Sequence, residues 1–492
     1  MAALLVGVAT AGALAAVDPG ETATARYFAS IRDQPSLLLA FLAEMPKGGD
    51  LHNHLTGAVY AESYLRWAAE DNLCLATATM TIVAATCDAA DGRPPVADVL
   101  RNATLFSQAI DAMSMRHWNR TLNGHDHFFA AFDKFGPPSD KTGDMLAEVA
   151  ARAAAERVSY LELMLSPNGT AARQRGRTAG WDPDLGRLRE RLLADGFQDV
   201  VAEARRRIDV AEARQRDLLR CGEKVDAAAC GVSIRYIAQA GRAGVPEQVF
   251  AQLLAGFEIG IQDPRFVGVN LVQPEDDPTA VRDFSLHMAM LDFLHGKYPG
   301  VRIALHAGEL VEGLVPPEAL RFHIRASLRT GHARRIGHAG GVMYEDDALG
   351  LLREMAANRV LVEVALSSND LILGIKGARH PVSMYLKYGV PVALVTDDAG
   401  VARSTMTLEL RKAVEEHALD YRTLKRMVRN SLEYSFADEL MKGRLRSGLE
   451  EAFKVFERRM GGRGRGLGDL GTGGSGTRGL TTNDQRPTTK SK

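Results

Sequence analysis

Strand-like apolar runs alternate with segments of helical periodicity along most of this 492-residue chain. Eight runs have the length and the apolar character of buried strands. They are residues 49–54, 158–166, 231–238, 266–272, 301–306, 335–338, 360–366 and 390–397. Segments between them, such as 247–257 and 279–295, repeat apolar residues at helical spacing. This alternation predicts an α/β fold in which eight parallel strands form a (β/α)8 TIM-type barrel.

Two segments are too long to be simple crossover helices. About a hundred residues separate the first two strands, several times what one crossover requires. Helical patterns near residues 58–70, 95–113 and 126–135 predict an extended helical insertion there, near residues 58–140. A second, charged elaboration of helical pattern is expected near residues 185–229. The barrel domain with both insertions is expected to span residues 17–460.

The two ends of the chain differ from this domain in composition. Residues 1–16 form an apolar run that ends in Ala13-Leu14-Ala15, a small-x-small pattern of the kind that signal peptidase cleaves. No Lys or Arg precedes the run, which departs from the usual signal peptide, and the run is too short for a membrane span. We expect export to the periplasm or out of the cell. Residues 461–492 are rich in Gly, Arg, Thr and Ser and predict a disordered tail.

Four cysteines fall in two local pairs, Cys74 with Cys87 and Cys221 with Cys230. Neither pair has the CxxC spacing of a zinc ribbon or a redox motif. Local pairs predict two disulfide-closed loops in an oxidising compartment. Four unconnected thiols in a cytosolic enzyme remain the alternative if residues 1–16 are not an export signal.

The charge balance bears on the partners of the protein. A formal net charge of −1 offers no basic excess to neutralise phosphates, so we do not expect a nucleic-acid binder. No later stretch is long and apolar enough to predict a stable membrane span.

Polar residues end four of the eight predicted strands. Because side chains alternate along a strand, two residues spaced as His52 and His54 point to the same side. The whole group is His52, His54, His306, His338, Asp397 and Asp398. Each alone is explained by a buried histidine bonded to a carbonyl or by a helix-capping aspartate. Together, at the barrel end where functional residues gather, they predict a shared metal site.

Four motifs carry a resemblance to a known family. They are Met45-Pro46-Lys47 before His52-x-His54, His306-Ala307-Gly308-Glu309, Arg335-Ile336-Gly337-His338 and Thr396-Asp397-Asp398. In this order they resemble the signature of the adenosine deaminase family, over residues 41–456. The long segment after the first strand, its cysteine pair and the apparent export signal resemble the secreted branch, the adenosine deaminase-related growth factors, and its exported bacterial relatives.

The resemblance implies a mechanism and a set of roles. It implies hydrolytic deamination of a small-molecule purine nucleoside, adenosine or 2′-deoxyadenosine, to inosine or 2′-deoxyinosine and ammonia. One Zn2+ per chain is expected on His52, His54, His306 and Asp397. Glu309 is expected to protonate the purine ring, His338 to orient the attacking water, and Asp398 to bind the imidazole half of the purine. Whether two chains form a homodimer remains open.

Two positions depart from the family pattern. Thr56 stands where vertebrate-type relatives have an Asp that contacts the ribose, and Gln273 stands where they have a Gly beside the purine. A deaminase that prefers a 5′-modified adenosine or another aminopurine therefore remains an alternative. AMP is expected to be a poor substrate, because no Lys or Arg cluster lies near these motifs in the sequence.

Two further readings compete with adenosine deamination. A different metal-dependent barrel hydrolase would also use a His-x-His strand, but the bridging Lys of binuclear members has no counterpart in residues 266–275. A non-catalytic binding protein on the same scaffold would be indicated by a missing metal ligand or a missing Glu309. Every one of these residues is present.

Overall fold

The computed structural model describes residues 18–119, 123–223 and 227–468. Eight parallel strands form the barrel, in the order β1-β4-β5-β6-β7-β8-β9-β10. Their bounds are β1 Gly48–His54, β4 Val158–Leu165, β5 Ser233–Gly241, β6 Phe266–Val272, β7 Arg302–Ala307, β8 Arg335–His338, β9 Leu361–Val364 and β10 Val392–Leu394. All eight predicted strands and the predicted TIM-type barrel are confirmed.

The barrel closes between its first and last strands. Asn53 bridges to Asp397 in parallel register, just beyond the end of β10. The N–H of Asp397 donates to the carbonyl of His52 at 2.9 Å, and the N–H of His54 donates to the carbonyl of Asp397 at 3.1 Å. Closure therefore occurs at the carboxyl ends of the strands, between residues that the sequence assigns to the metal site.

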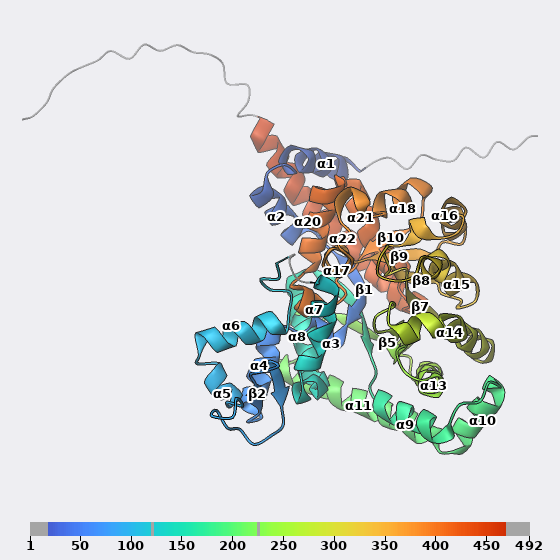
Figure 1. Cartoon of the computed structure of the whole chain (residues 1–492). Coiled ribbons are helices and arrows are strands. Elements are labelled where there is room, and N and C mark those ends of the chain that lie inside the picture. Colours follow the sequence, from blue (N-terminus) through green and yellow to red (C-terminus); the bar gives the residue numbers. More distant parts are fainter. Residues whose placement is uncertain (1–17, 120–122, 224–226, 469–492) are drawn as a thin grey trace, which may run out of the picture.

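Helices surround the barrel (Figure 1). In the predicted β/α repeat they are α8 Thr142–Ala155, α13 Pro246–Gln262, α14 Pro278–Lys297, α15 His323–Arg329, α16 Ala348–Ala357, α18 Val382–Tyr388, α20 Met406–His417 and α21 Tyr421–Glu433. Short helices at the strand ends are α3 Leu55–Ala58, η3 Pro317–Arg321, η4 Val342–Tyr344, α17 Leu366–Leu373, η5 Gly377–Arg379 and α19 Ala399–Ala402. Pro278 in the first turn and the Asp277 side chain, which accepts from Thr279 N–H at 2.8 Å, explain where α14 begins.

The insertion after β1 forms a separate lobe, drawn in blue in Figure 1. It contains α4 Ala61–Glu70, the hairpin β2 Cys74–Ala76 and β3 Thr81–Val83, α5 Val96–Val99, α6 Ala103–Ala112, α7 Gly124–Ala130, η1 Phe132–Lys134 and η2 Pro137–Asp140. The prediction of a single helix over residues 95–113 is wrong, because this segment forms two helices, α5 and α6. Asn102 accepts from the N–H of Leu105 at 3.1 Å and so begins a new helix, α6, after a break.

The second elaboration is an arm of helices, α9 Gly169–Ala179, α10 Leu185–Ala194, α11 Phe197–Leu218 and α12 Ala227–Cys230, shown in green at the lower edge of Figure 1. It confirms the helical pattern near residues 185–229. Both predicted disulfides are present: the sulfurs are 1.99 Å apart in Cys74–Cys87 and 1.94 Å apart in Cys221–Cys230.

The terminal helices α1 Pro19–Ile31, α2 Pro35–Glu44 and α22 Glu439–Gly468 pack together. Helix α22 continues eight residues into the segment expected to be disordered, so that expectation is wrong for residues 461–468. Met460 is buried, and the guanidinium groups of Arg459 and Arg463 meet the carboxylate of Glu44. The rest of the predicted tail, and the predicted signal peptide, lie outside the described residues. Within the described ranges, no helix is both long and apolar enough to cross a membrane.

Candidate active site

Four side chains converge at the carboxyl ends of the barrel strands. His52 and His54 come from the end of β1, His306 from β7, and Asp397 from the turn after β10. One potential ligand atom from each lies within 4.8 Å of the others. Nε2 of His54 is 3.1 Å from Nε2 of His306, and Oδ1 of Asp397 is 3.4 Å from Nε2 of both β1 histidines. The fold thus brings together all four residues that the sequence predicts as metal ligands.

The surroundings of the histidines fit a metal ion. Each Nδ1 faces an oxygen acceptor, which makes Nδ1 the protonated nitrogen and leaves Nε2 with a free electron pair. The pairs are His52 with Glu363 at 2.8 Å, His54 with Gln239 at 3.3 Å and His306 with Asn270 at 3.0 Å. In the described part of the chain, the buried Nε2 of His52 has no hydrogen-bond partner. Three imidazoles and one carboxylate are a donor set that suits a catalytic zinc ion.

A line of buried charges stands behind His52. Oε1 of Glu363 lies 2.6 Å from Nε of Arg335, and Nη2 of Arg335 donates to Oε2 of Glu162 at 2.6 Å. Burial alone would raise the pKa of Glu363, but Arg335 and His52 lower it, so Glu363 is a carboxylate. Sequence reasoning missed this support. The only local hint of these buried ion pairs in the sequence is that Glu162 and Glu363 each interrupt an apolar strand pattern.

Glu309 and His338 lie beside the ligand cluster. Oε1 of Glu309 is 3.6 Å from Nε2 of His338, and Nε2 of His338 is 3.9 Å from Oδ2 of Asp397. Burial raises the pKa of Glu309, which favours its protonated form. Nδ1 of His338 faces Oδ1 of Asn369 at 3.0 Å, which fixes the direction of its Nε2. Glu309, as a proton donor, and His338 therefore lie next to each other beside the cluster of predicted metal ligands.

The turn after β7 fixes Glu309 from behind. Gly308 has φ +69°, and a Cβ there would meet the side chain of Ile324 at 2.6 Å. The N–H groups of Gly308 and Glu309 donate to the buried Glu275 carboxylate at 3.1 and 2.8 Å. His323 meets the same carboxylate at 2.6 Å. Glu275 therefore acts as a positioning residue for the Glu309 turn.

These groups line one cavity of about 280 Å³. The predicted residues on its wall are His54, Thr56, Gln273, His306, Glu309, His338, Asp397 and Asp398. His52 is fully buried behind them. Gln273 has φ +80°, a region that favours glycine, and its Oε1 accepts from Ala243 N–H at 3.0 Å. Its side-chain amide therefore turns toward the end of β5, while the residue still lines the cavity.

Asp398 is a buried residue on the wall of the cavity. Burial and the neighbouring Asp397 raise the pKa of Asp398. A Cβ at Gly57 would lie 1.6 Å from Oδ1 of Asp398, so only glycine at position 57 leaves room for this carboxyl group. Among the described residues, the buried Oδ1 of Asp398 has no hydrogen-bond partner.

The insertion covers one side of the cavity with Phe128, Phe129 and Phe132. Helix α7 is held there by His125, whose Nε2 lies 2.9 Å from Oδ1 of Asp276, a residue that follows β6. Nδ1 of the same imidazole lies 2.9 Å from Asp126. Sequence reasoning placed a helix here but did not assign these aromatic side chains to the site, because local periodicity does not show what a helix face will cover.

The sequence profile of the adenosine deaminase family matches residues 108–452, more than half of the chain. The chain belongs to the adenosine deaminase family. An adenosine deaminase from Clostridium perfringens is 29% identical over 148 residues, 30% of this chain. That match spans only 41% of the relative's length.

Solved structures share the adenosine deaminase family's barrel. Adenine deaminase from Arthrobacter aurescens is 19% identical with a TM-score of 0.53, over 83% of this chain and 99% of that one. The apo N6-methyl-AMP deaminase from Arabidopsis thaliana is 20% identical with a TM-score of 0.55, over 84% of this chain and 98% of that one. At these identities the likeness concerns the fold alone.

Proposed function

We propose that the protein is a zinc-dependent aminohydrolase that converts adenosine and 2′-deoxyadenosine to inosine and 2′-deoxyinosine, with release of ammonia. The main support for this proposal is the position of the buried acid Glu309. It lies 3.6 Å from His338 and lines the same cavity as His54, His306 and Asp397. Hydrolytic deamination needs an activated water on one side of a ring carbon and a proton donor for the adjacent ring nitrogen. This cavity offers both.

The ligand set His52, His54, His306 and Asp397 would hold the metal. A zinc ion there would lower the pKa of a water molecule towards ~7. His338 orients that water and accepts its proton, with Nδ1 anchored on Asn369. The oxygen of water bonds to the amino-bearing carbon. His338 passes the proton that it accepted to the amino group, the C–N bond breaks and ammonia leaves, and the second proton of the water passes to Glu309, which restores the acid.

The base is recognised by two protonated carboxyl groups. Glu309, whose pKa burial raises, donates a proton to the ring nitrogen next to the carbon under attack. Asp398, whose pKa is also raised, donates a hydrogen bond to an acceptor nitrogen on the imidazole half of the purine. Phe128 and Phe129 close the cavity against bulk water. Thr56 and Gln273 lie on its wall and set the preference for the sugar.

Turnover of a substrate panel tests the function. Zinc-loaded protein receives adenosine, 2′-deoxyadenosine, adenine, AMP and N6-methyl-AMP, and the released amine is measured for each, which is ammonia for the first four compounds and methylamine for N6-methyl-AMP. Adenine and N6-methyl-AMP are included because solved relatives of the same fold are named for them. We expect turnover of the two nucleosides, its loss after chelation and its return with added zinc. Absence of ammonia from every compound would refute the proposal.

We also infer that the protein is exported and belongs to the secreted, growth-factor-related branch of the family. Two disulfides support export, because disulfides persist in oxidising compartments. N-terminal sequencing of protein from the native source tests it. A mature chain that begins near residue 17 is expected, and a cytosolic chain that retains residues 1–16 would contradict it.

A further inference from the structure

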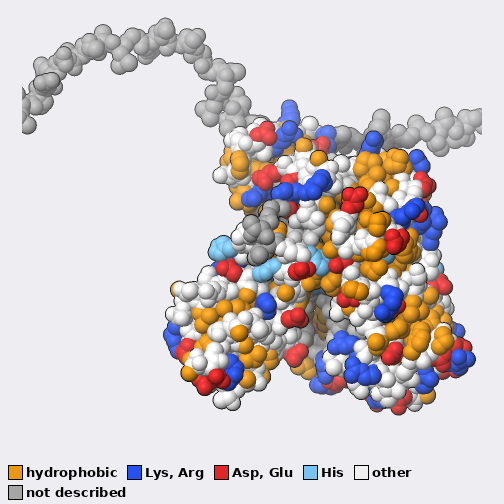
Figure 2. All heavy atoms as spheres, viewed as in Figure 1, with side chains coloured by type: hydrophobic (Ala, Val, Ile, Leu, Met, Phe, Trp, Pro, Cys, Tyr) orange, Lys and Arg blue, Asp and Glu red, His pale blue; other side chains and the backbone are white. Residues whose placement is uncertain are grey.

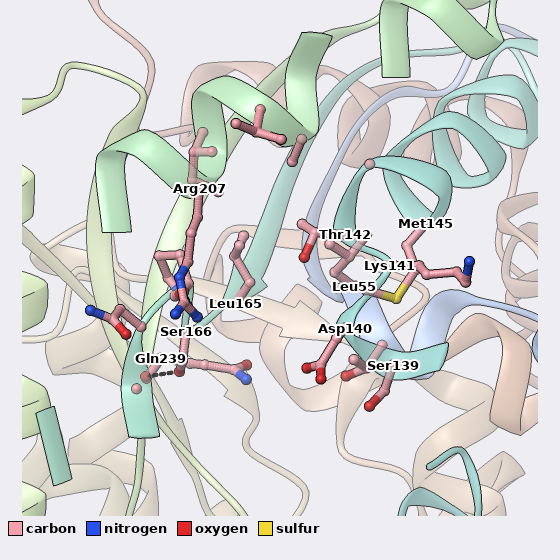
Figure 3. Close-up of a pocket in the computed structure, with 18 of the residues that line it drawn as sticks. Leu55, Ser139, Asp140, Lys141, Thr142, Met145, Leu165, Ser166, Arg207 and Gln239 are labelled. Carbon is pink, nitrogen blue, oxygen red and sulfur yellow. Dashed lines mark hydrogen bonds between the residues drawn. The ribbon is translucent and has the colours of Figure 1, made fainter. Parts of the chain in front are cut away.

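A second and larger cleft adjoins the catalytic cavity. Its volume is about 670 Å³, against about 280 Å³ for the cavity beside the metal ligands. One wall consists of the end of β4, the end of β5 and helix α11, and the other of η2 and the start of α8 (Figure 3). Figure 2 shows the surface hollowed between the insertion lobe and the barrel. No role in deamination of a simple nucleoside accounts for this space.

The two spaces share Thr56 and Gln239. The Gln239 side chain contacts the ligand His54 at 3.3 Å, and its backbone carbonyl accepts from the Ser166 hydroxyl at 2.5 Å (Figure 3). Next to Ser166, the carbonyl of Pro167 accepts from Nη1 of Arg207 at 3.2 Å. A short line of contacts therefore leads from the metal site to Arg207. A group that leaves the catalytic cavity past Thr56 enters the cleft.

The cleft wall is basic. It carries Arg206, Arg207, Arg214 and Lys141, and a single acidic residue, Asp140. The carboxylates that pair with these cations, Glu203, Asp144 and Asp71, do not line the cleft. Arg206 and Arg207 share the single carboxylate of Glu203, so these two guanidinium groups have one paired acid between them. The fold therefore brings Lys and Arg side chains to a cleft beside the catalytic cavity, although they lie far from the family motifs in the sequence.

The rest of the lining also identifies a ligand class. Five hydroxyl-bearing residues line this space, namely Thr56, Ser139, Thr142, Ser166 and Thr170, and among the described residues no aromatic side chain lines it. Hydroxyls and guanidinium groups suit sugars and phosphates, whereas a second base would be expected to stack on an aromatic ring. Neutral Thr56 at the junction places no negative charge in the path of a phosphate. The volume far exceeds that of one phosphate group.

We propose that the cleft binds the 5′ substituent of an adenine nucleotide, and that the preferred class carries a diphosphate-linked sugar at the 5′ position. The adenine then lies in the 280 Å³ cavity with its amino group at the metal ligands. The diphosphate lies along Arg207 and Arg214, and the sugar meets the hydroxyl-lined wall. This assignment rests on the proposed deaminase function and adds the substrate class to it.

Binding and turnover together test the proposal. Binding of ADP-ribose, AMP and adenosine to the zinc-loaded E309Q variant is measured by calorimetry, so the result does not depend on catalysis. We expect ADP-ribose to bind at least about 10-fold more tightly than adenosine, because one additional charge-assisted hydrogen bond changes the dissociation constant by about that factor. That advantage should shrink as salt rises, because exposed charges are screened.

Variants identify the cleft as the cause. R207A and R214A should each reduce the ratio of ADP-ribose to adenosine affinity by about 10-fold, and D140N should increase it. R216A is the matched control, since Arg216 is exposed on the same helix and does not line the cleft. Equal affinities for ADP-ribose and adenosine, or an R216A effect as large as that of R207A, would overturn the proposal. Good adenosine turnover with that result would leave the deaminase function intact.

Discussion

Nδ1 of His52 lies 2.8 Å from Oε2 of Glu363, and the other oxygen of the same carboxylate faces Nε of Arg335 at 2.6 Å. All three side chains are buried. A histidine held in this way keeps its proton on Nδ1 and presents Nε2 to a metal at a fixed angle. The metal site therefore depends on Glu363, which contacts the ligand His52, and on Arg335 behind it, although neither belongs to the predicted ligand set.

Replacing Glu363 by Gln should weaken metal binding by about 10- to 100-fold, the usual cost of removing a carboxylate that orients a metal-bound histidine. The competition of the purified variant with a chromogenic chelator measures this. E354Q, which removes a more exposed carboxylate paired with Arg329, is the control and should leave metal affinity unchanged. Thermal unfolding of the metal-free variant separates a general loss of stability from a weaker site. An unchanged metal affinity in E363Q would contradict this role.

The variant E309Q should lose at least ~10²-fold in deamination rate, because an amide is not acidic enough to protonate the ring nitrogen. Zinc content and fold should be retained, since Glu309 is outside the proposed ligand set. Ammonia release and metal analysis on the same preparation provide the measurement. E312Q changes an exposed carboxylate in the same loop and should behave as wild type. Near-normal turnover of E309Q would show that another group is the acid.

The contact between His125 and Asp276 should make the attachment of α7 depend on pH. Burial lowers the pKa of His125, but Asp276 and Asp126 outweigh it and raise the pKa to about 9. Histidine in an unfolded chain has a pKa of about 6.5. The stabilisation is therefore complete below about pH 6.5 and is lost as pH rises through about 9.

Hydrogen exchange of the α7 amides in wild type and H125Q measures this contribution. The difference in opening free energy should be about 1.5–3 kcal/mol at pH 6, the usual value for a hydrogen bond to a charged group. It should approach zero by pH 10. H117Q removes an exposed histidine of the same insertion and serves as the control. A difference that stays constant from pH 6 to pH 10 would rule out the charged pair.

The disulfides should each add about 2–3 kcal/mol to the free energy of unfolding, because they close loops with sequence separations of 13 and 9 residues. Denaturant unfolding of the C74S/C87S and C221S/C230S double variants measures each contribution separately. Alkylation of the unreduced, denatured protein is expected to label no thiol. Labelling of all four cysteines would show that the bonds do not form in the protein as isolated.

The sequence predicted the barrel and the ligand set because both leave local signals. Strand periodicity marks β1 and β7, and His52, His54 and His306 stand at the strand ends where a barrel collects its functional groups. In contrast, Glu363 is one charged residue in an apolar run, and its meaning comes from Arg335, a partner on the neighbouring strand. The pairing of Glu363 with Arg335 cannot be predicted from the local sequence around either residue.

Long-range packing also explains the wrong boundaries. Helix α22 persists past residue 460 because Glu44, on a helix at the other end of the chain, pairs with Arg459 and Arg463. The composition of this segment favours disorder when it is considered alone. The basic cleft was missed for the same reason, since Lys141 and Arg207 are far apart in sequence and lie on opposite walls of one cleft in the folded protein (Figure 3).

The closure of the barrel sets an order of events during biosynthesis. His52 leaves the ribosome more than three hundred residues before Asp397, and the two meet only when the β1 end is joined to the chain beyond β10. A nascent chain that has not yet supplied Asp397 has three imidazoles but no carboxylate and no closed barrel. The complete set of three imidazoles and one carboxylate therefore forms only after the chain beyond β10 has been synthesised and the barrel has closed. The compartment in which folding is completed would then decide which metal the enzyme receives.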